Sequence, residues 1–244
     1  MTARALLQLL AVLLVTLALA VVVIVLVPLA RGTSVFPILA RLWSRMVLRI
    51  LGVRLEVDGV GRVDPSRAGV FISNHESLLD PPALLLAIPA DVRAIAKRSL
   101  FFIPIFGQAL WAGGIIPIDR SHRERAIASM RRAALRVRNG AFLLVFPEGT
   151  RREGGQTLRP FKKGAFLLAI EAQAPIYPVV VRGARRLLPP GALFCRPGTV
   201  RITFLPAVGT TGLSSADRDR LIQDVARRMQ ECLTGRSPAR QAAR

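Results

Sequence analysis

The sequence contains few of the residues that carry metal, redox or stacking chemistry. It has two cysteines, two histidines and 6% aromatic residues among 244. Cys195 and Cys232 stand far apart, form no C-x-x-C pair and have no histidine nearby. This spacing gives no support to zinc ligation and predicts inert, reduced thiols, as in a cytoplasmic domain.

Several catalytic motifs are also absent. The chain has no G-x-S-x-G elbow, no G-x-x-x-x-G-K-[ST] phosphate loop and no H-E-x-x-H zinc motif, and Gly59-Val60-Gly61 lacks the third glycine of a dinucleotide fingerprint. Nucleotide and zinc chemistry therefore have no support, and we expect no metal and no cofactor. Because no covalent nucleophile stands out, direct attack by a substrate hydroxyl is the simpler chemistry.

Acidic residues are scarce as well. Against 35 lysines and arginines there are 15 aspartates and glutamates, which gives a net charge of +20. Such a charge favours an anionic partner, either nucleic acid or an anionic membrane leaflet. All but three of the basic residues are arginine, a bias that can belong to the source rather than to function. Since no basic segment carries interleaved aromatics that stack bases, we expect membrane lipids and no nucleic acid as partners.

Apolar residues, 52% of the chain, gather near the amino terminus. Residues 5–30 carry no charge and can cross the roughly 30 Å hydrocarbon layer of a bilayer. A cleaved signal peptide has a shorter apolar region and a small-x-small cleavage site, which Val27-Pro28-Leu29-Ala30 fits poorly. We therefore predict an uncleaved membrane anchor over residues 1–33, and whether it spans the bilayer or lies along it stays open.

Basic residues around the apolar segment predict its orientation. One arginine precedes it and several follow: Arg4 before, and Arg31, Arg41, Arg45, Arg49 and Arg54 after. Because basic residues stay preferentially on the cytoplasmic side, we expect a membrane protein whose catalytic part faces the cytoplasm.

The next segment has a helical charge pattern. Residues 36–51 carry arginines spaced four apart on one helical face and apolar residues over most of the rest. This pattern predicts an amphipathic helix in the membrane interface, over residues 34–52. An ordinary domain helix with a charged outer face remains the alternative.

Residues 53–234 predict one α/β domain. Short apolar runs alternate with helical patterns, which is typical of a mostly parallel, mixed sheet of about six to seven strands flanked by helices. The expected strands are 54–58, 70–73, 92–96, 115–118, 142–146, 176–181 and 200–204. Polar residues 235–244 predict a flexible basic tail.

One helix and the strand after it point to a candidate site. Residues 121–138 predict a helix that begins with the capping box Ser121-His122-Arg123-Glu124 and ends at Asn139-Gly140. The apolar run A-F-L-L-V-F then suits a strand buried on both faces, and it opens into P-E-G-T-R. Ligands of open α/β sheets bind beyond the carboxyl ends of the strands, where this segment lies.

His75 is the candidate general base. It follows an apolar run and precedes Asp80-Pro81-Pro82, where Asp80 suits an N-cap and Pro81 the first helical position. With a turn between them, Asp80 can hold one imidazole nitrogen and leave the other free to take a proton. A helix cap and a loop histidine remain the alternative, because H-x4-D is common by chance. His122 lies among arginines at the start of an exposed helix, which assigns it to the surface.

Arg120 and Arg151 are candidate anion ligands. G-G-I-I-P-I-D-R ends in Arg120 and F-P-E-G-T-R ends in Arg151, each just after a predicted strand. A guanidinium group can donate two parallel hydrogen bonds to a phosphate. Pairing with Asp119 or Glu148 is the alternative.

Four blocks together resemble the 1-acylglycerol-3-phosphate O-acyltransferase family, the lysophosphatidate acyltransferases. N-H-E-S-L-L-D corresponds to the family's N-H-x4-D block, and G-G-I-I-P-I-D-R, F-P-E-G-T-R and A-P-I-Y-P-V-V-V correspond to its second, third and fourth blocks. K-R-S-L-F-F-I-P-I-F-G resembles the family's lysine-containing segment. The resemblance covers residues 50–205. Ser99 and Pro117 depart from the family pattern, and these differences bear on acyl-chain or acceptor preference rather than on the reaction.

The resemblance implies a mechanism. His75, oriented by Asp80, would remove the proton of the acceptor hydroxyl while that oxygen attacks a thioester carbonyl, with no acyl-enzyme. Arg120 and Arg151, assisted by Lys97, would hold the acceptor phosphate. The substrate-binding residues implied in this way are Lys97, Gly114, Arg120, Glu148, Gly149, Thr150 and Arg151.

The resemblance also implies the substrates. The donor would be acyl-CoA or an acyl-carrier protein, and the acceptor the sn-2 hydroxyl of 1-acylglycerol-3-phosphate, which gives phosphatidate for phospholipid biosynthesis. Another lyso-lipid acceptor, such as lyso-ornithine lipid, remains open.

Overall fold

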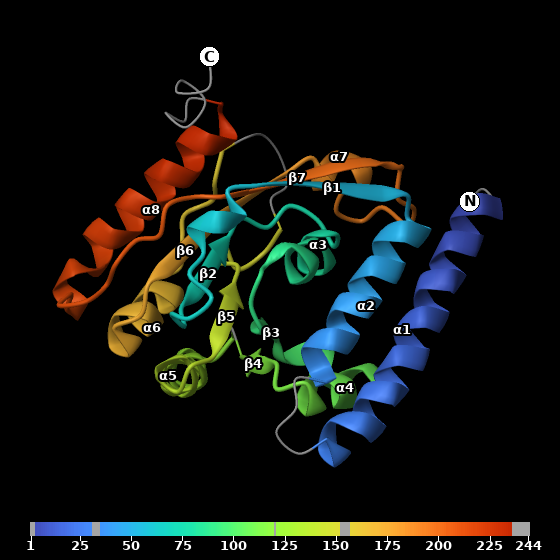
Figure 1. Cartoon of the computed structure of the whole chain (residues 1–244), viewed down its shortest axis with the longest axis horizontal. Coiled ribbons are helices and arrows are strands. Elements are labelled where there is room, and N and C mark those ends of the chain that lie inside the picture. Colours follow the sequence, from blue (N-terminus) through green and yellow to red (C-terminus); the bar gives the residue numbers. More distant parts are fainter. Residues whose placement is uncertain (1–2, 31–34, 120, 152–156, 236–244) are drawn as a thin grey trace.

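The computed structural model describes residues 3–30, 35–119, 121–151 and 157–235, with the backbone alone at Arg123. In these residues a seven-stranded sheet has helices on both faces, and a hairpin of two long helices lies along one side (Figure 1). The strands are β1 (Val53–Asp58), β2 (Val70–Ser73), β3 (Val92–Lys97), β4 (Ile116–Ile118), β5 (Phe142–Val145), β6 (Ile176–Arg182) and β7 (Gly198–Phe204). The helices are α1 (Ala3–Leu29), α2 (Val35–Ile50), α3 (Asp80–Ala87), α4 (Phe106–Ala112), α5 (Arg123–Arg138), α6 (Gly164–Ala172), α7 (Ala184–Leu187) and α8 (Arg218–Leu233).

The strand order is β1-β7-β6-β2-β5-β3-β4. All neighbouring pairs are parallel except β6 and β7, so the predicted mostly parallel, mixed sheet is confirmed. The carboxyl ends of β6, β2, β5, β3 and β4 therefore lie at one edge of the sheet. Because β7 runs against β6, the residues that begin β7 and β1 lie at that edge too.

The core has two layers, one on each face of the sheet. In β2, Val70 and Ile72 face the layer under α5, α6 and α8, and Phe71 faces the layer under α2, α3 and α7. Successive strand side chains point to opposite faces, so a strand covered on both sides is apolar throughout. This accounts for the unbroken apolar runs in β2 and β5, all of whose residues are buried.

Helix α1 is long and apolar enough to cross a membrane by length and composition. It lies antiparallel to α2 and also contacts α4 (Figure 1). The indole N–H of Trp43 on α2 donates to Oγ1 of Thr16 on α1 at 3.0 Å. Near the other end, Ala20 and Val23 of α1 pack against Ala109 of α4. Helix α1 is thus joined to the domain over much of its length, while most of its leucines are exposed.

Two predicted helix starts are wrong. Helix α3 begins at Asp80 with Leu79 as its N-cap, and the Asp80 carboxylate points back toward residues 75–77 instead of capping. Helix α5 begins at Arg123 without a side-chain cap, because the Ser121 hydroxyl donates to Asp119 at 2.6 Å. A nearby carboxylate competed for the serine that would have formed the capping box. The strand predicted over residues 70–73 matches β2, and the limits of the other six strands differ from those predicted by one or two residues.

Both cysteines are buried. Burial raises the pKa of the Cys195 thiol from 9.0 to about 11.

Since the thiolate is the reactive form, Cys195 should resist iodoacetamide at pH 8 in the folded protein and react after unfolding, as measured by mass spectrometry. The folded pKa is the higher one, so the stability linked to this thiol is complete below pH 9 and is lost as the pH rises toward 11. Rapid labelling of the native protein would contradict this prediction.

Candidate active site

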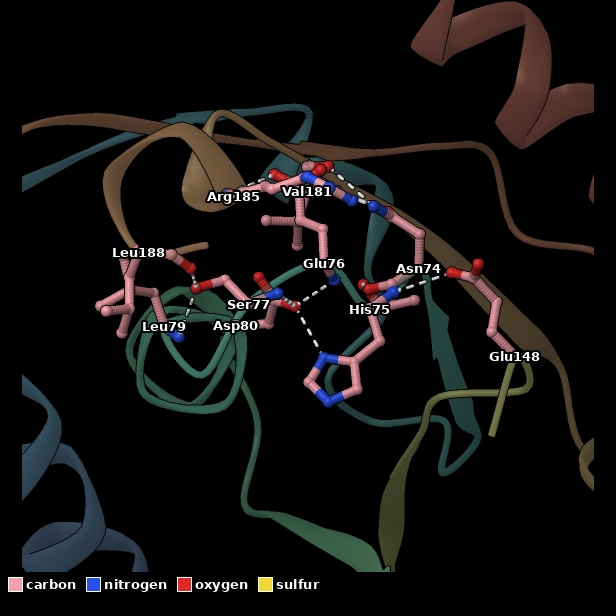
Figure 2. A network of polar contacts seen from close by, with 11 residues as sticks. Asn74, His75, Glu76, Ser77, Leu79, Asp80, Glu148, Val181, Arg185 and Leu188 are labelled. Carbon is pink, nitrogen blue, oxygen red and sulfur yellow. Dashed lines mark hydrogen bonds and ion pairs between the residues drawn. The ribbon is translucent and has the colours of Figure 1, made fainter. Parts of the chain in front are cut away.

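The segment after β2 leaves the sheet while one side chain keeps the contact with β6. Backbone pairing between β2 and β6 extends to Ser73. Beyond it, the Asn74 carboxamide donates to the Val181 carbonyl and accepts from the Val181 N–H, both at 2.8 Å (Figure 2). The buried side-chain amide of Asn74 thus takes the place of the next backbone pair between β2 and β6. Residues 75–79 can therefore leave the sheet and form a turn.

Asp80 fixes the imidazole of His75. Its Oδ2 lies 2.7 Å from His75 Nδ1, and the same oxygen accepts from the backbone N–H of Glu76 at 2.6 Å and of Ser77 at 2.8 Å (Figure 2). The two residues after Asp80 are prolines, which have no N–H to compete for the carboxylate. This network assigns the proton to Nδ1 and leaves Nε2 as an acceptor.

The imidazole plane is set by an aromatic contact. The ring of Phe146, just after β5, stacks on the His75 ring with centroids 4.2 Å apart and planes 24° apart. The His75 side chain is 18% exposed, so the stack covers one side without closing the site to substrate. Phe146 and Asp80 together hold the ring in one orientation.

Glu148 holds the backbone of the turn. One carboxylate oxygen accepts from the His75 N–H at 2.9 Å, and the other accepts from the Arg159 N–H at 3.0 Å. Glu148 is only 3% exposed. The structure therefore places this carboxylate between two backbone segments, where it can shape the site without facing solvent.

Gly149 and Lys162 meet in the turn after β5. Gly149 has φ +74°, and a Cβ there would lie 2.7 Å from Cε of Lys162. The Lys162 N–H also donates to the Pro147 carbonyl at 2.8 Å. An exposed lysine is thus held against the turn, a cation that sequence reasoning missed because only the fold brings the two residues together.

Two further polar residues tie the His75 turn to the segment after β6. The Ser77 hydroxyl donates to the Leu188 carbonyl at 2.8 Å, and Glu76 accepts from the Arg185 N–H at 3.3 Å (Figure 2). The residues that follow the fourth sequence block therefore contact the first block and support its turn. Asn74, Glu76 and Ser77 were not among the predicted site residues, although buried polar residues directly after an apolar strand were the available signal.

The remaining predicted residues fall in different places. Lys97 is the exposed last residue of β3, next to Ile118 in register, and Arg120 lies outside the described residues. Arg151 is half-buried and Thr150 exposed, directly after Gly149. Gly114 precedes β4, so it lies at the opposite end of that strand, where its carbonyl accepts from Arg136 at 2.6 Å.

Asp119 follows β4 and is already paired. Its carboxylate accepts from Ser121 and lies 3.0 Å from Arg98 and 3.4 Å from Arg125. The hydrogen bond from Ser121, and after it that from Arg98, hold the pKa of this carboxyl well below its ordinary value. The negative charge of Asp119 at the end of β4 is thus compensated by Arg98 and Arg125.

The sheet arranges these groups in a row. Along its edge come His75 after β2, the turn from Phe146 to Arg151 after β5, Lys97 at the end of β3 and Asp119 after β4. Adjacent strands lie about 4.8 Å apart, so the row spans roughly 14 Å. A base at one end and cations further along suit a substrate that carries both a reacting hydroxyl and an anionic group.

These features define a class of site: a histidine base oriented by a buried carboxylate at the ligand-binding edge of an α/β sheet. Among the described residues, no serine or cysteine side chain is hydrogen-bonded to Nε2 of His75. The chain belongs to the acyltransferase family, whose family model, described as Acyltransferase, matches residues 54–182. The resemblance read from the sequence is thereby confirmed.

Similar proteins agree with this assignment. Human 1-acyl-sn-glycerol-3-phosphate acyltransferase beta is 38% identical over 179 residues, which cover 73% of this chain and 64% of the human protein. The chain therefore matches just under two thirds of that relative. The human alpha protein is 36% identical over 190 residues, 78% of this chain and 67% of the relative.

A solved structure shows the same fold. The crystal structure of the 1-acyl-sn-glycerophosphate (LPA) acyltransferase PlsC from Thermotoga maritima superposes with a TM-score of 0.80 over 95% of both chains, at 24% sequence identity. The likeness extends beyond the region of the family model to the helical hairpin.

The position of Glu148 generates a stability prediction. In Glu148→Gln, one oxygen becomes an NH2 group that faces a backbone N–H, so a buried donor loses its acceptor. We expect a loss of about 1–3 kcal/mol in the free energy of unfolding, measured by urea titration in detergent. Glu171→Gln, at an exposed glutamate, is the matched control and should change it by less than about 0.5 kcal/mol. Equal effects would mean that the Glu148 bonds contribute nothing specific.

Proposed function

We propose that this protein is an O-acyltransferase that moves a fatty acyl group from acyl-CoA or an acyl-carrier protein to the sn-2 hydroxyl of 1-acylglycerol-3-phosphate. The product is phosphatidate, for phospholipid biosynthesis. The single observation that carries the proposal is the 2.7 Å bond between His75 Nδ1 and Asp80, which leaves Nε2 free as a base. The names of the similar human proteins support the choice of acceptor.

The reaction follows from this geometry. His75 Nε2 takes the acceptor's hydroxyl proton as the oxygen attacks the thioester carbonyl. The new C–O bond forms, the C–S bond breaks, and the proton passes from His75 to the departing thiolate. Asp80 stabilises the imidazolium that forms in between. The acyl group goes directly to the acceptor, without an acyl-enzyme.

The acceptor phosphate is assigned to the cations of the row. Arg151 comes after β5, the strand next to β2, and Lys97 ends β3, one strand further along the sheet. We include Arg120, which lies outside the described residues, because it follows β4. Glu148, Gly149 and Thr150 contribute the turn over which the acceptor lies. Holding the hydroxyl and the carbonyl in reacting geometry lowers the barrier by several kcal/mol.

Helix α1 fits association with a membrane, where a lyso-lipid acceptor resides. Its exposed side chains are apolar over many turns, including Leu7, Leu13, Leu14 and Leu29. The arginines that follow α1 favour the cytoplasmic face for the catalytic domain.

The base is tested by two histidine variants. His75→Ala should lower the rate of acyl transfer at least a hundredfold, because general base catalysis contributes about 10²–10⁴. His122→Ala, at the exposed start of α5, should retain the full rate. The assay uses detergent-purified protein, labelled acyl-CoA or acyl-carrier protein, and lysophosphatidate. Full activity of His75→Ala would remove the proposal.

The phosphate contact is tested by a charge deletion. Arg151→Ala should raise KM for lysophosphatidate about 10–100-fold, since a charged hydrogen bond contributes about 1.5–3 kcal/mol. Arg131→Ala, on the exposed face of α5, should leave KM unchanged. A panel of other lyso-lipids is measured in parallel. Preference for an acceptor without phosphate, such as lyso-ornithine lipid, would show that Arg151 has another role.

A further inference from the structure

A second basic surface lies at the same sheet edge as His75 but is separate from it. A groove of about 770 Å³ opens between the carboxyl end of α2, the start of β1 and the residues that lead into β7. Its walls combine three arginines with apolar side chains: Arg45, Arg49, Arg54, Leu48, Leu86 and Pro197 are the principal ones. None of the residues that line it is acidic.

The arginines of α2 divide into two groups. Arg41 is used inside the protein, where it donates to the carbonyls of Ile88 at 2.7 Å and Ala90 at 3.1 Å and so caps the end of α3. Arg45 and Arg49 lie one and two turns further on and are exposed, as is Arg54 on β1. Arg41 therefore has a structural role, and the other three guanidinium groups face the groove.

Among the described residues, the three groove arginines have no counter-charge. Glu56, the nearest glutamate along β1, pairs with Arg201 on β7 instead. Across the described part of the chain, no carboxylate lies within ion-pair distance of Arg45, Arg49 or Arg54. Like charges four residues apart destabilise a helix, and a bound anion relieves that repulsion.

The topology places this groove beside the proposed site of chemistry. Val53, which begins β1, pairs with Gly198, which begins β7, and Gly198 N–H donates to the Gly52 carbonyl at 3.1 Å. Since β7 is antiparallel to β6, these residues lie at the edge of the sheet where His75 follows β2. Strands β7 and β6 separate β1 from β2, about 14 Å in all at 4.8 Å per strand.

We propose that the groove binds one molecule of an anionic phospholipid. Its phosphate lies on Arg45, Arg49 and Arg54, and an acyl chain covers the partly exposed Leu55 and Leu86. Guanidinium groups match phosphate oxygens, and the apolar wall excludes water that a free inorganic anion would keep. The apolar surface of α1 brings the domain to a lipid layer where such molecules are abundant. This site does not use His75 and goes beyond the proposed reaction.

The test measures lipid binding rather than turnover. Full-length protein in an uncharged detergent is titrated with a fluorescent phosphatidylglycerol, which is neither the proposed acceptor nor its product. Arg45→Ala/Arg49→Ala should weaken binding at least tenfold. Arg131→Ala/Arg132→Ala removes the same charge from the exposed face of α5 and should change it less than threefold. Thermal unfolding by circular dichroism checks that both variants fold.

Three comparisons make the result decisive. Phosphatidylcholine should compete poorly, inorganic phosphate at the same concentration should not displace the probe, and His75→Ala should bind it as the wild type does. Acyl transfer by Arg45→Ala/Arg49→Ala to a short-chain, water-soluble acceptor should stay within twofold. Equal losses in the two double variants, displacement by inorganic phosphate, or loss of binding in His75→Ala would each overturn the proposal. Failure of acyl transfer in the wild type would leave the binding result intact and count only against the proposed function.

Discussion

The site depends on one oxygen atom, Oδ2 of Asp80, which accepts three hydrogen bonds inside the protein. A fully buried carboxylate is costly unless donors surround it. Its other oxygen, Oδ1, is buried without a hydrogen-bond partner among the described residues, so Oδ2 carries the whole compensation. Turning His75 away would remove one of three donors. The imidazole is therefore held by the need to solvate a charge, and the shape of the turn follows from the same need.

This carboxylate can act only because other strands hold the turn around it. Asn74 fixes the start of the turn to β6, Glu148 fixes the His75 backbone to the turn after β5, and Phe146 covers the ring. Each contact joins residues far apart in the sequence. The fourth block, which offers no catalytic group, contributes a backbone acceptor at Val181, and Leu188, a few residues beyond the block, contributes another. These backbone carbonyls hold the first block in position.

Much of the fold could be predicted from the sequence, because a strand buried on both faces must be apolar and a parallel sheet must alternate with helices. The gathering of His75, the P-E-G-T-R segment and Lys97 at one edge followed from that topology. The errors were local choices between hydrogen-bond partners. Asp80 and Ser121 both fit capping patterns, yet each found a stronger partner, His75 and Asp119 respectively. Two further contacts depend on the paths of loops, which the periodicity of the sequence does not predict. One is the hydrogen bond between Glu148 and the His75 backbone, and the other is the contact of Lys162 with Gly149.

The contact between Gly149 and Lys162 has a consequence for how the site can vary. The left-handed backbone at Gly149 already disfavours a side chain. A methyl group there would also push against the end of Lys162 and shift its ammonium group. A substitution at this position therefore moves a charge as well as straining the chain. In variants of this turn selected for activity, a change at position 149 would therefore alter the position of a positive charge, although glycine itself carries none.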